Sequence, residues 1–396
     1  MILFIISIND FIKLVKESCD VDGYLRWLHL LVLMDDTVLL STTRRGIQEK
    51  LELLNQYCHT HQTKVNNSKT KFFVVNGSAE DRQPFIMELF TVGWCDSYVY
   101  LGSIFTSDGN TSSAIKEHAV AKASQTFKFV QFIRKNQDIP FCVKLRVFHA
   151  CILSSLLYGC ESWLTGDTRP VARLYNTCIK TLLGVRSSTC NDICYVELGL
   201  PPIKATITLR QRSFVRNMWR TRSGLNDDPW TFAMQIARGA RNVTSRHLEN
   251  LLTQDINDVD MANEDTRRSI VTSISSRRTK YTAMNPTLSV HPIYNQQTAS
   301  PMGEVHRLSF TKMRVSAHSL AIETGRWNRG GRGRLPVEER LCRCGAVQDE
   351  LHVLEACPET EHLRQEYGFR TYEELIAEDS HFSAPEIIHK ILAIFE

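Results

Sequence analysis

The sequence lacks a hydrophobic run long enough to cross a membrane, since such a helix needs roughly 20 consecutive apolar residues. The apolar stretch at its start, residues 1–8, has no basic leader and is followed directly by Asn9 and Asp10. These are the wrong flanks for a secretory signal peptide. We therefore expect an intracellular protein, nuclear or cytoplasmic, that is neither secreted nor bound to a membrane.

The sequence also has little excess of charge, and most of its cysteines lack metal-binding spacing. A formal net charge of +4 over 396 residues says nothing by itself about partners, although arginines cluster in the second half. Nine of the 12 cysteines are scattered, and in an intracellular protein we expect reduced thiols. No internal repeat and no endonuclease domain is recognisable. Its content of 43% hydrophobic and 23% charged residues is typical of a globular protein, and its length of 396 residues predicts two or three domains.

Two short apolar runs rich in Val and Leu enclose a pair of adjacent acids, Asp35 and Asp36, within residues 30–41. Such runs predict buried strands, and Asp is common in tight turns, so the stretch predicts a hairpin with both carboxylates at its tip. Two acids on one rigid turn suit Mg²⁺, which proteins hold through one or two carboxylates and substrate phosphates. In two-metal nucleotidyl transfer such ions stabilise the attacking and the leaving oxygen. The alternative is an ordinary Asp–Asp turn.

The periodicity around this hairpin predicts an α+β protein. Helices are predicted over residues 2–16, after a cap at Thr42 or Thr43, over 112–134, from Pro140 onwards and over 171–183. Strands are predicted over residues 72–75 and on both sides of Gly102. A segment that contains sheets is thus followed, from about residue 111, by a helical one.

Four short motifs occur in order along this part of the chain. The hairpin reads Leu33-Met34-Asp35-Asp36, and residues 66–71 read Asn-Asn-Ser-Lys-Thr-Lys. Tyr100-Leu101-Gly102 follows, and then residues 156–163, which read Leu-Leu-Tyr-Gly-Cys-Glu-Ser-Trp. With these motifs the chain resembles the C-terminal half of reverse transcriptases from non-LTR (LINE-type) retrotransposons. The resemblance covers about residues 2–200 and again about 326–364.

The resemblance implies a partial polymerase palm, a small antiparallel sheet with packed helices, followed by a mainly helical thumb. Asp35 and Asp36 would be the magnesium-binding carboxylates, and Lys69 would lie near the incoming nucleotide. The turn residues Tyr100, Leu101 and Gly102 would help to hold the primer end. On spacing alone, Lys69 is better explained as a residue that protects a strand edge from aggregation.

The sequence departs from this family in two respects. Leu33 stands where the family has an aromatic residue that can pack on primer or template. The family's other metal-binding Asp lies on an earlier strand, and we expect the sequence to begin after it and after the fingers. Because catalysis of this kind depends on positioning and preorganised charge, we expect a truncated polypeptide that is inactive as a polymerase on its own.

Arginines are concentrated in two segments of the second half. Residues 203–222 predict a helix in which Arg216 and Arg220 lie among other basic residues and aromatics, a pattern that suits a phosphate backbone. The alternative is a solvated helix face. Residues 325–334 alternate Arg with Gly around one Trp, and Arg pairs bidentately with phosphate. The candidate nucleic-acid contacts in this segment, which could equally be a linker, are Arg326, Arg329, Arg332 and Arg334.

A set of Cys and His residues lies near the C-terminus, at Cys342, Cys344, His352 and Cys357. Structural zinc sites take four such ligands in a tetrahedron. Gly345 allows the tight turn that a zinc knuckle needs, although one residue between the first two cysteines is shorter than the usual spacing. Similar clusters end many non-LTR elements. We therefore predict zinc binding, with three buried thiols and a surface histidine as the alternative.

Together these patterns divide the chain into five consecutive segments. They are a partial palm (1–110), a helical thumb (111–200), a basic helical region (201–284), a linker with the Arg/Gly segment (285–335) and a zinc-knuckle-like region (336–396). RNA and DNA, as template and primer, are the expected partners, with Mg²⁺ and Zn²⁺ as cofactors. The leading hypothesis is a reverse transcriptase derived from a non-LTR retrotransposon. The alternatives are a non-catalytic zinc-dependent RNA- or DNA-binding protein, and a decaying element copy without a selected function.

Overall fold

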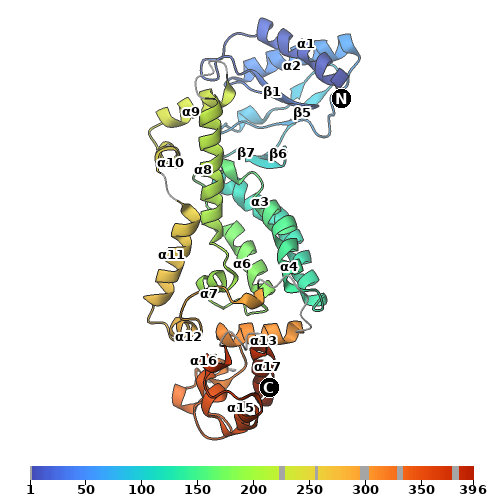
Figure 1. The fold of residues 1–396 in the computed structure, drawn as a ribbon. Helices are drawn as coiled ribbons and strands as arrows, with labels where there is room; N and C mark the ends of the chain where they lie inside the picture. Colours follow the sequence, from blue (N-terminus) through green and yellow to red (C-terminus); the bar gives the residue numbers. More distant parts are fainter. Residues whose placement is uncertain (1, 223–227, 255–256, 295–302, 328–332, 377–382) are drawn as a thin grey trace. The chain divides into compact units, whose positions relative to one another are not determined.

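The fold is that of an α+β protein with small sheets and many helices, as the sequence predicts (Figure 1). The computed structural model describes residues 2–222, 228–254, 257–294, 303–327, 333–376 and 383–396. These residues form two compact units, each assembled from separate stretches of the chain. The first unit comprises Met1–Glu117, Leu164–Gly166 and Asn217–Glu249, and the second comprises His118–Trp163, Asp167–Arg216 and Asn250–Glu396.

The first unit contains the predicted hairpin, packed on two helices. β1 (Leu30–Leu33) pairs antiparallel with β2 (Asp36–Leu39), and α1 (Ile2–Ser18) packs against α2 (Arg44–His61) (Figure 1). Apolar side chains of both helices and of the hairpin share one core around Phe11. As expected, Thr43 caps α2, since its hydroxyl accepts the backbone N–H of Gly46 at 3.0 Å. This cap fixes where the chain leaves the hairpin and becomes helical.

Two further small sheets complete this part of the first unit. One has the strand order β3 (Lys71–Phe72), β5 (Thr91–Trp94), β4 (Phe85–Ile86), with β3 parallel and β4 antiparallel to β5. The other is a hairpin of β6 (Ser97–Tyr100) and β7 (Ser103–Thr106). The strand predicted over residues 72–75 ends at Phe72, because its partner strand stops there and Asn76 turns the chain with a φ of 57°.

The rest of the first unit comes from much later in the sequence. α9 (Pro229–Gly239) contributes Phe232, whose ring lies 6.1 Å from that of Trp27, between centroids. The guanidinium of Arg26 lies 5.5 Å from the centroid of the same Phe232 ring. These contacts attach α9 to the loop that precedes β1.

Helices dominate the later part of the chain. The helices predicted after residue 111 are observed as α3 (Thr111–Lys135), α4 (Phe141–Val147), which runs through a π-helical turn (Phe148–Leu153) into α5 (Ser154–Leu156), and α6 (Arg169–Leu183). They are followed by α7 (Asn191–Leu198), α8 (Ile203–Arg222), α10 (Val243–Thr253), α11 (Asp258–Val271) and α12 (Ser276–Met284). The C-terminal helices are α13 (Glu304–Arg314), α14 (Ala321–Thr324), α15 (Glu361–Tyr367), α16 (Tyr372–Leu375) and α17 (Ala384–Phe395).

The described part of residues 285–335 is not the linker that the sequence predicted. Leu288, Ile293 and Tyr294 are buried, and α13 packs against α17 (Figure 1). One face of α13 carries polar side chains that are buried rather than solvated, at Glu304, Arg307, Thr311 and Arg314. Because buried polar residues alternate here with the buried Phe310 and Met313, the helix shows no separate apolar stripe of the kind that marks an amphipathic helix.

Candidate metal centres and nucleic-acid interface

Asp35 and Asp36 lie exposed at the tip of the β1–β2 hairpin. Leu33 pairs with Asp36, so Met34 and Asp35 form a two-residue turn, with Met34 at a φ of 56°. Two-residue hairpin loops require such positive φ values. The sequence predicted buried strands, but only one face of β1 is covered. Leu30 and Val32 pack on the core, whereas Leu31 and Leu33 are 37% and 49% exposed. The hairpin therefore presents two carboxylates on a surface that is otherwise apolar.

The β6–β7 hairpin brings Tyr100 near this acidic tip. Burial raises the pKa of Tyr100, and the charge of Asp36 raises it further, so the two side chains lie within electrostatic reach. Leu101 and Gly102 both have positive φ, 49° and 79°, and form the tight turn between the two strands. Lys69 is exposed, and its carbonyl accepts the Tyr98 hydroxyl at 3.1 Å, which ties its backbone to β6.

Asp22, the nearest upstream acid, is used within the fold. Its carboxylate accepts the backbone N–H groups of Tyr24, Leu25 and Thr42, each at 2.9 Å, and so joins the two ends of the hairpin. Burial raises the pKa of Asp22, but these hydrogen bonds outweigh it and hold the pKa well below its ordinary range. Within the described ranges, no third His, Cys or acid is gathered with Asp35 and Asp36.

The basic helix α8 uses part of its positive charge internally. Arg212 forms a buried ion pair with Asp258, at 2.9 Å. Arg216 donates to the carbonyls of Leu251 and Gln254 at the end of α10. Such guanidiniums cap a helix end and stabilise its dipole. The internal partners of Arg212 and Arg216 were expected neither from a phosphate-binding helix nor from a solvated face, while Arg220 is exposed.

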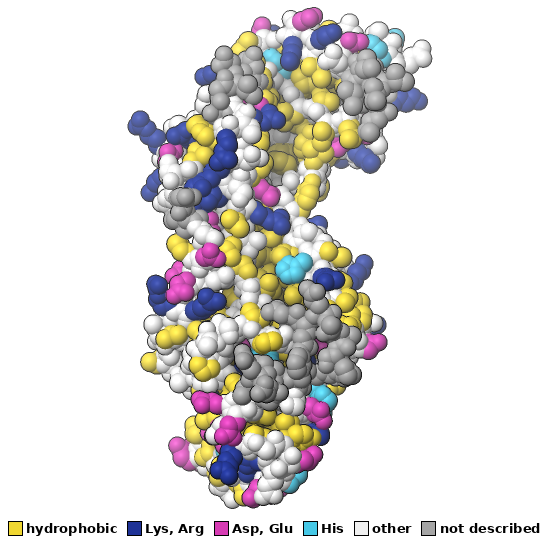
Figure 2. Space-filling view, in the orientation of Figure 1, with side chains coloured by type: hydrophobic (Ala, Val, Ile, Leu, Met, Phe, Trp, Pro, Cys, Tyr) yellow, Lys and Arg dark blue, Asp and Glu magenta, His cyan; other side chains and the backbone are white. Residues whose placement is uncertain are grey.

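Exposed arginines gather instead in residues 217–249 of the first unit. They are Arg220, Arg222, Arg238, Arg241 and Arg246. Figure 2 shows Lys and Arg side chains, in dark blue, close together on the visible face over α8 to α10. Two of these arginines have acidic partners: Arg222 pairs with Asp228 and Arg238 with Glu249. The Arg238 guanidinium also lies 5.0 Å from the Trp219 ring.

The Arg/Gly segment begins inside the second unit rather than as a free strand. Arg326 forms an ion pair with the buried Glu323, at 2.9 Å, and Trp327 stacks on Arg186, whose guanidinium is 3.8 Å from the ring centroid. Arg334 is exposed. Arg329 and Arg332 lie outside the described residues. A role of these arginines in nucleic-acid binding therefore stays a prediction.

The predicted zinc ligands Cys342, Cys344, His352 and Cys357 converge, with all four ligand atoms within 4.8 Å of one another. The Sγ atoms of Cys342 and Cys357 are 3.6 Å apart, and Cys344 Sγ is 3.2 Å from His352 Nε2. Ordinary Zn–S and Zn–N bonds place the donor atoms of a tetrahedral zinc about 3.5–3.8 Å apart. The Cys342–Cys357 separation lies in this range and the Cys344–His352 separation is shorter, while three sulfurs and one imidazole nitrogen are a donor set that zinc binds. Gly345 takes a φ of 92°, in the turn where glycine was expected. Two ligands are buried, Cys342 and Cys357, while Cys344 is exposed.

Sequence reasoning missed a group of buried carboxylates in the second unit. They are Glu197, Glu304, Glu323 and Glu350, and each is paired with Arg, Lys or His side chains, most of them from distant parts of the chain. Glu304, for example, accepts Lys144 Nζ at 2.8 Å and Arg307 Nε at 2.9 Å. The only indication of these buried charges in the sequence was the spacing of Glu304, Arg307 and Arg314, which places three charged residues on one face of a helix.

The N-terminal part of the chain matches a known family. Residues 1–105 match the family model described as "Reverse transcriptase (RNA-dependent DNA polymerase)". The match covers the two hairpins that carry Asp35, Asp36 and Tyr100. A search of curated proteins and a search of solved structures each found no match. None of the described helices has the length and apolar character of a membrane span.

Proposed function

We propose that residues 1–105 are part of the palm of a reverse transcriptase of the non-LTR type, in which Asp35 and Asp36 bind Mg²⁺. The observation that carries this proposal is that the region matching the reverse transcriptase family presents two adjacent, exposed carboxylates at a hairpin tip. When bound there, Mg²⁺ supplies positive charge to the attacking and leaving oxygens of nucleotidyl transfer. The finer assignment to non-LTR elements rests on the order of the four sequence motifs.

In this proposal the neighbouring hairpin positions the primer. Tyr100, Leu101 and Gly102 form a turn whose backbone is fixed by two successive positive φ angles, and Tyr100 lies near Asp36. A rigid turn beside a metal site can hold a primer end at a constant distance from it, which is what a reaction limited by positioning requires. Lys69, tied through its carbonyl to Tyr98, would face the phosphates of the incoming nucleotide.

We further propose that these 396 residues do not synthesise DNA by themselves. Two ions need more ligands than two adjacent carboxylates provide, and the described residues gather no third acid at the hairpin tip. The test is template-dependent incorporation of nucleotides with Mg²⁺ or Mn²⁺, using Asp35→Ala and, as a matched control, Asp138→Ala in an exposed loop. Incorporation that disappears in Asp35→Ala but persists in Asp138→Ala would refute the proposed inactivity and establish the site.

A second candidate function, binding of RNA or DNA without catalysis, is favoured by the exposed arginines of residues 217–249. Each phosphate contact contributes about 0.7–0.9 to the slope of log affinity against log salt. Replacing Arg220, Arg241 and Arg246 by Ala should therefore reduce that slope by about two to three. Arg343→Ala, in the acidic C-terminal region, is the control and should leave the slope unchanged. A chain that binds no nucleic acid at low salt would leave only the decaying element copy.

We propose that Cys342, Cys344, His352 and Cys357 bind one zinc ion. The support is the convergence of three sulfurs and one imidazole nitrogen, ligand types of structural zinc sites, within 4.8 Å of one another. The test is metal content by emission spectroscopy of protein made in zinc-supplemented medium. One equivalent of zinc is expected in the wild type and in Cys151→Ser, which changes an exposed cysteine elsewhere, and none in Cys344→Ser. A wild type without stoichiometric zinc would end the proposal.

A further inference from the structure

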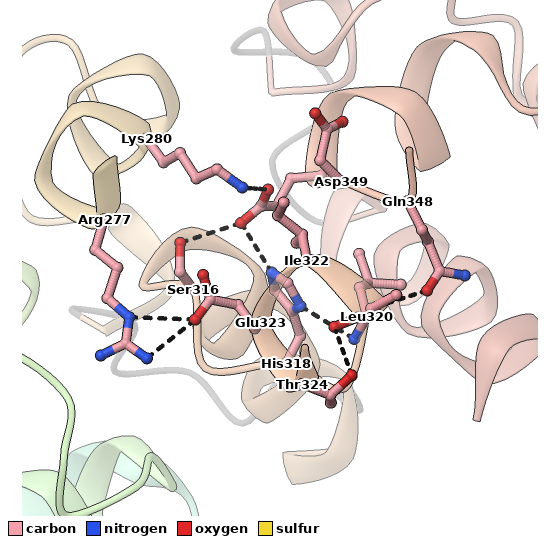
Figure 3. Close-up of polar contacts among 12 residues, drawn as sticks. Arg277, Lys280, Ser316, His318, Leu320, Ile322, Glu323, Thr324, Gln348 and Asp349 are labelled. Atoms are coloured by element: carbon pink, nitrogen blue, oxygen red, sulfur yellow. Dashed lines mark hydrogen bonds and ion pairs between the residues drawn. The ribbon is translucent and has the colours of Figure 1, made fainter. Parts of the chain in front are cut away.

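The loop that carries the four zinc ligands, residues 342–357 (the zinc loop), also carries two buried polar side chains. Gln348 and Glu350 lie between the second ligand, Cys344, and the third, His352. Their relative exposures are 9% and 2%. Figure 3 shows the Gln348 side chain directed at residues 320–324, which belong to the preceding part of the second unit. The zinc loop is therefore attached to the helical part of the second unit by residues that lie between its zinc ligands.

Gln348 joins the zinc loop to the start of α14. Its side-chain Oε1 accepts the backbone N–H of Ala321 at 2.7 Å, and its carbonyl accepts the N–H of Ile322 at 3.1 Å. Its own N–H donates to the carbonyl of Arg340 at 2.8 Å. Arg340 in turn donates through Nη1 to the carbonyl of Ile322 at 2.9 Å. One side chain and its peptide groups thus satisfy the first backbone donors of a helix.

Glu350 joins the zinc loop to α12 and to the turn after α13. Its carboxylate accepts Ser316 Oγ at 3.1 Å and His318 Nε2 at 3.0 Å, and it pairs with Lys280 (Figure 3). The backbone N–H of Leu320 donates to His318 Nδ1 at 3.3 Å, so Nε2 carries the proton that faces Glu350. With the carboxylate only 3% exposed, these three partners replace its hydration.

The surroundings of the zinc loop do not suit a phosphate backbone. Between Leu335 and Ile376, acidic residues outnumber basic ones, which are Arg340, Arg343, Arg364 and Arg370. Two of these four are used internally: Arg340 donates to backbone carbonyls, as described, and Arg364 donates to the carbonyl of Cys357 at 2.6 Å. A loop that binds nucleic acid needs exposed positive charge, because contacts with phosphates supply most of the affinity for nucleic acid.

We propose that the zinc loop is a metal-dependent latch. By this we mean that zinc fixes residues 342–357 in the conformation in which Gln348 and Glu350 make the contacts described above. These contacts then hold residues 316–324 and α12 in place. The proposal rests on the zinc binding proposed above. It gives the metal a role in the integrity of the second unit and none in contacting nucleic acid.

Linkage makes the latch quantitative. If zinc favours the contacts of Glu350, those contacts must favour zinc by the same factor. A hydrogen-bonded pair of a buried carboxylate and a cation is among the stronger interactions in a protein, so removing the charge should weaken zinc binding by about tenfold. Removing a zinc ligand should weaken zinc binding far more, because mutation of residues that only hydrogen-bond to metal ligands already lowers metal affinity by about 10- to 100-fold.

The experiment compares amide hydrogen exchange in the full chain with and without zinc, followed by mass spectrometry. In wild type stripped by a chelator and in Cys344→Ser, exchange should accelerate at least about tenfold in residues 276–284 and 316–324, as well as in the zinc loop. Glu350→Gln at saturating zinc should accelerate the same two segments while its zinc affinity, measured by chelator competition, falls about tenfold. Cys151→Ser should match the wild type throughout.

Two results would overturn the latch, and they are distinguishable from failure of zinc binding itself. The latch is wrong if zinc removal accelerates exchange only within residues 342–357, or if Glu350→Gln binds zinc as tightly as wild type. A wild type that contains no zinc would remove the metal site and the latch together. A fall in the salt slope of RNA binding on Arg343→Ala would assign the zinc loop to nucleic acid instead.

Discussion

The buried pair of Glu197 and Arg314 offers the sharpest test of how the second unit is held together. Glu197, on α7, is 0% exposed, and its two oxygens accept four hydrogen bonds. Arg314 Nε donates to Oε1 at 2.8 Å and Arg314 Nη2 to Oε2 at 3.2 Å. The hydroxyls of Tyr281 and Tyr294 donate at 2.8 Å and 2.9 Å. The perturbation is Glu197→Gln, which keeps the shape and removes the charge.

The expected cost follows from these contacts. A glutamine keeps one carbonyl oxygen, so it can accept two of the four bonds, and its NH₂ group faces the donors of the other two. Hydrogen bonds to charged groups contribute about 1.5–3 kcal/mol each. Arg314, whose side chain is 3% exposed, is left as a buried cation, and breaking one partner of such a pair typically costs about 3–5 kcal/mol. We therefore expect the free energy of unfolding of the second unit to fall by about 3–5 kcal/mol in Glu197→Gln.

The assay is native-state hydrogen exchange of the amides in α7 and α13. A loss of about 3–5 kcal/mol corresponds to exchange that is faster by about 10² to 10⁴. The double variant Glu197→Gln with Arg314→Met removes both charges, and it should cost at least about 2 kcal/mol less than the sum of the two single variants. Asp167→Asn, in an exposed ion pair, should leave these rates unchanged. Acceleration below tenfold, or additive costs in the double variant, would refute the reasoning.

Two further predictions concern pH and backbone conformation. Burial raises the pKa of Glu304, but Arg307 and Lys144 outweigh it and the pKa lies below its ordinary value. The ionised Glu304 therefore contributes its full stabilisation above the unfolded pKa of about 4.3, and this contribution is lost as the pH falls below that value. The urea midpoint of the second unit should decline below about pH 5, and it should decline less steeply in Glu304→Gln. Gly102→Ala places a Cβ at a φ of 79° and should destabilise the first unit by about 1 kcal/mol in urea unfolding; Gly23→Ala, where a Cβ meets nothing within 4 Å, should not.

Local patterns predicted the local structure well. The hairpin with Asp35 and Asp36 at its tip, the cap at Thr43 and the helix over 203–222 are all observed. Each depends on residues close together in sequence, whose turn chemistry and periodicity act whatever the rest of the chain does. The convergence of the Cys/His set was predicted for a related reason, because four residues of zinc-ligand type lie within 16 residues of sequence.

The parts that sequence reasoning missed are those in which distant residues satisfy each other. Arg216 matched a phosphate-binding pattern, but its partners, two carbonyls at the end of α10, are about 35 residues away in the chain. The helix α13 lay within the predicted linker, and it buries charged side chains that are paired with residues of α4 and α7. Ion pairs of this kind leave no local signature, since either partner alone resembles a surface residue.

The first unit is built from stretches that lie far apart in the chain, and this has a consequence for its synthesis. The aromatic contact between Trp27 and Phe232 can form only after about 200 further residues have been added. At roughly 5–20 residues per second, ribosomes take roughly 10–40 s to supply them. During that interval the Trp27 indole lacks its contact with Phe232, and the surface that α9 later covers is open on the nascent chain.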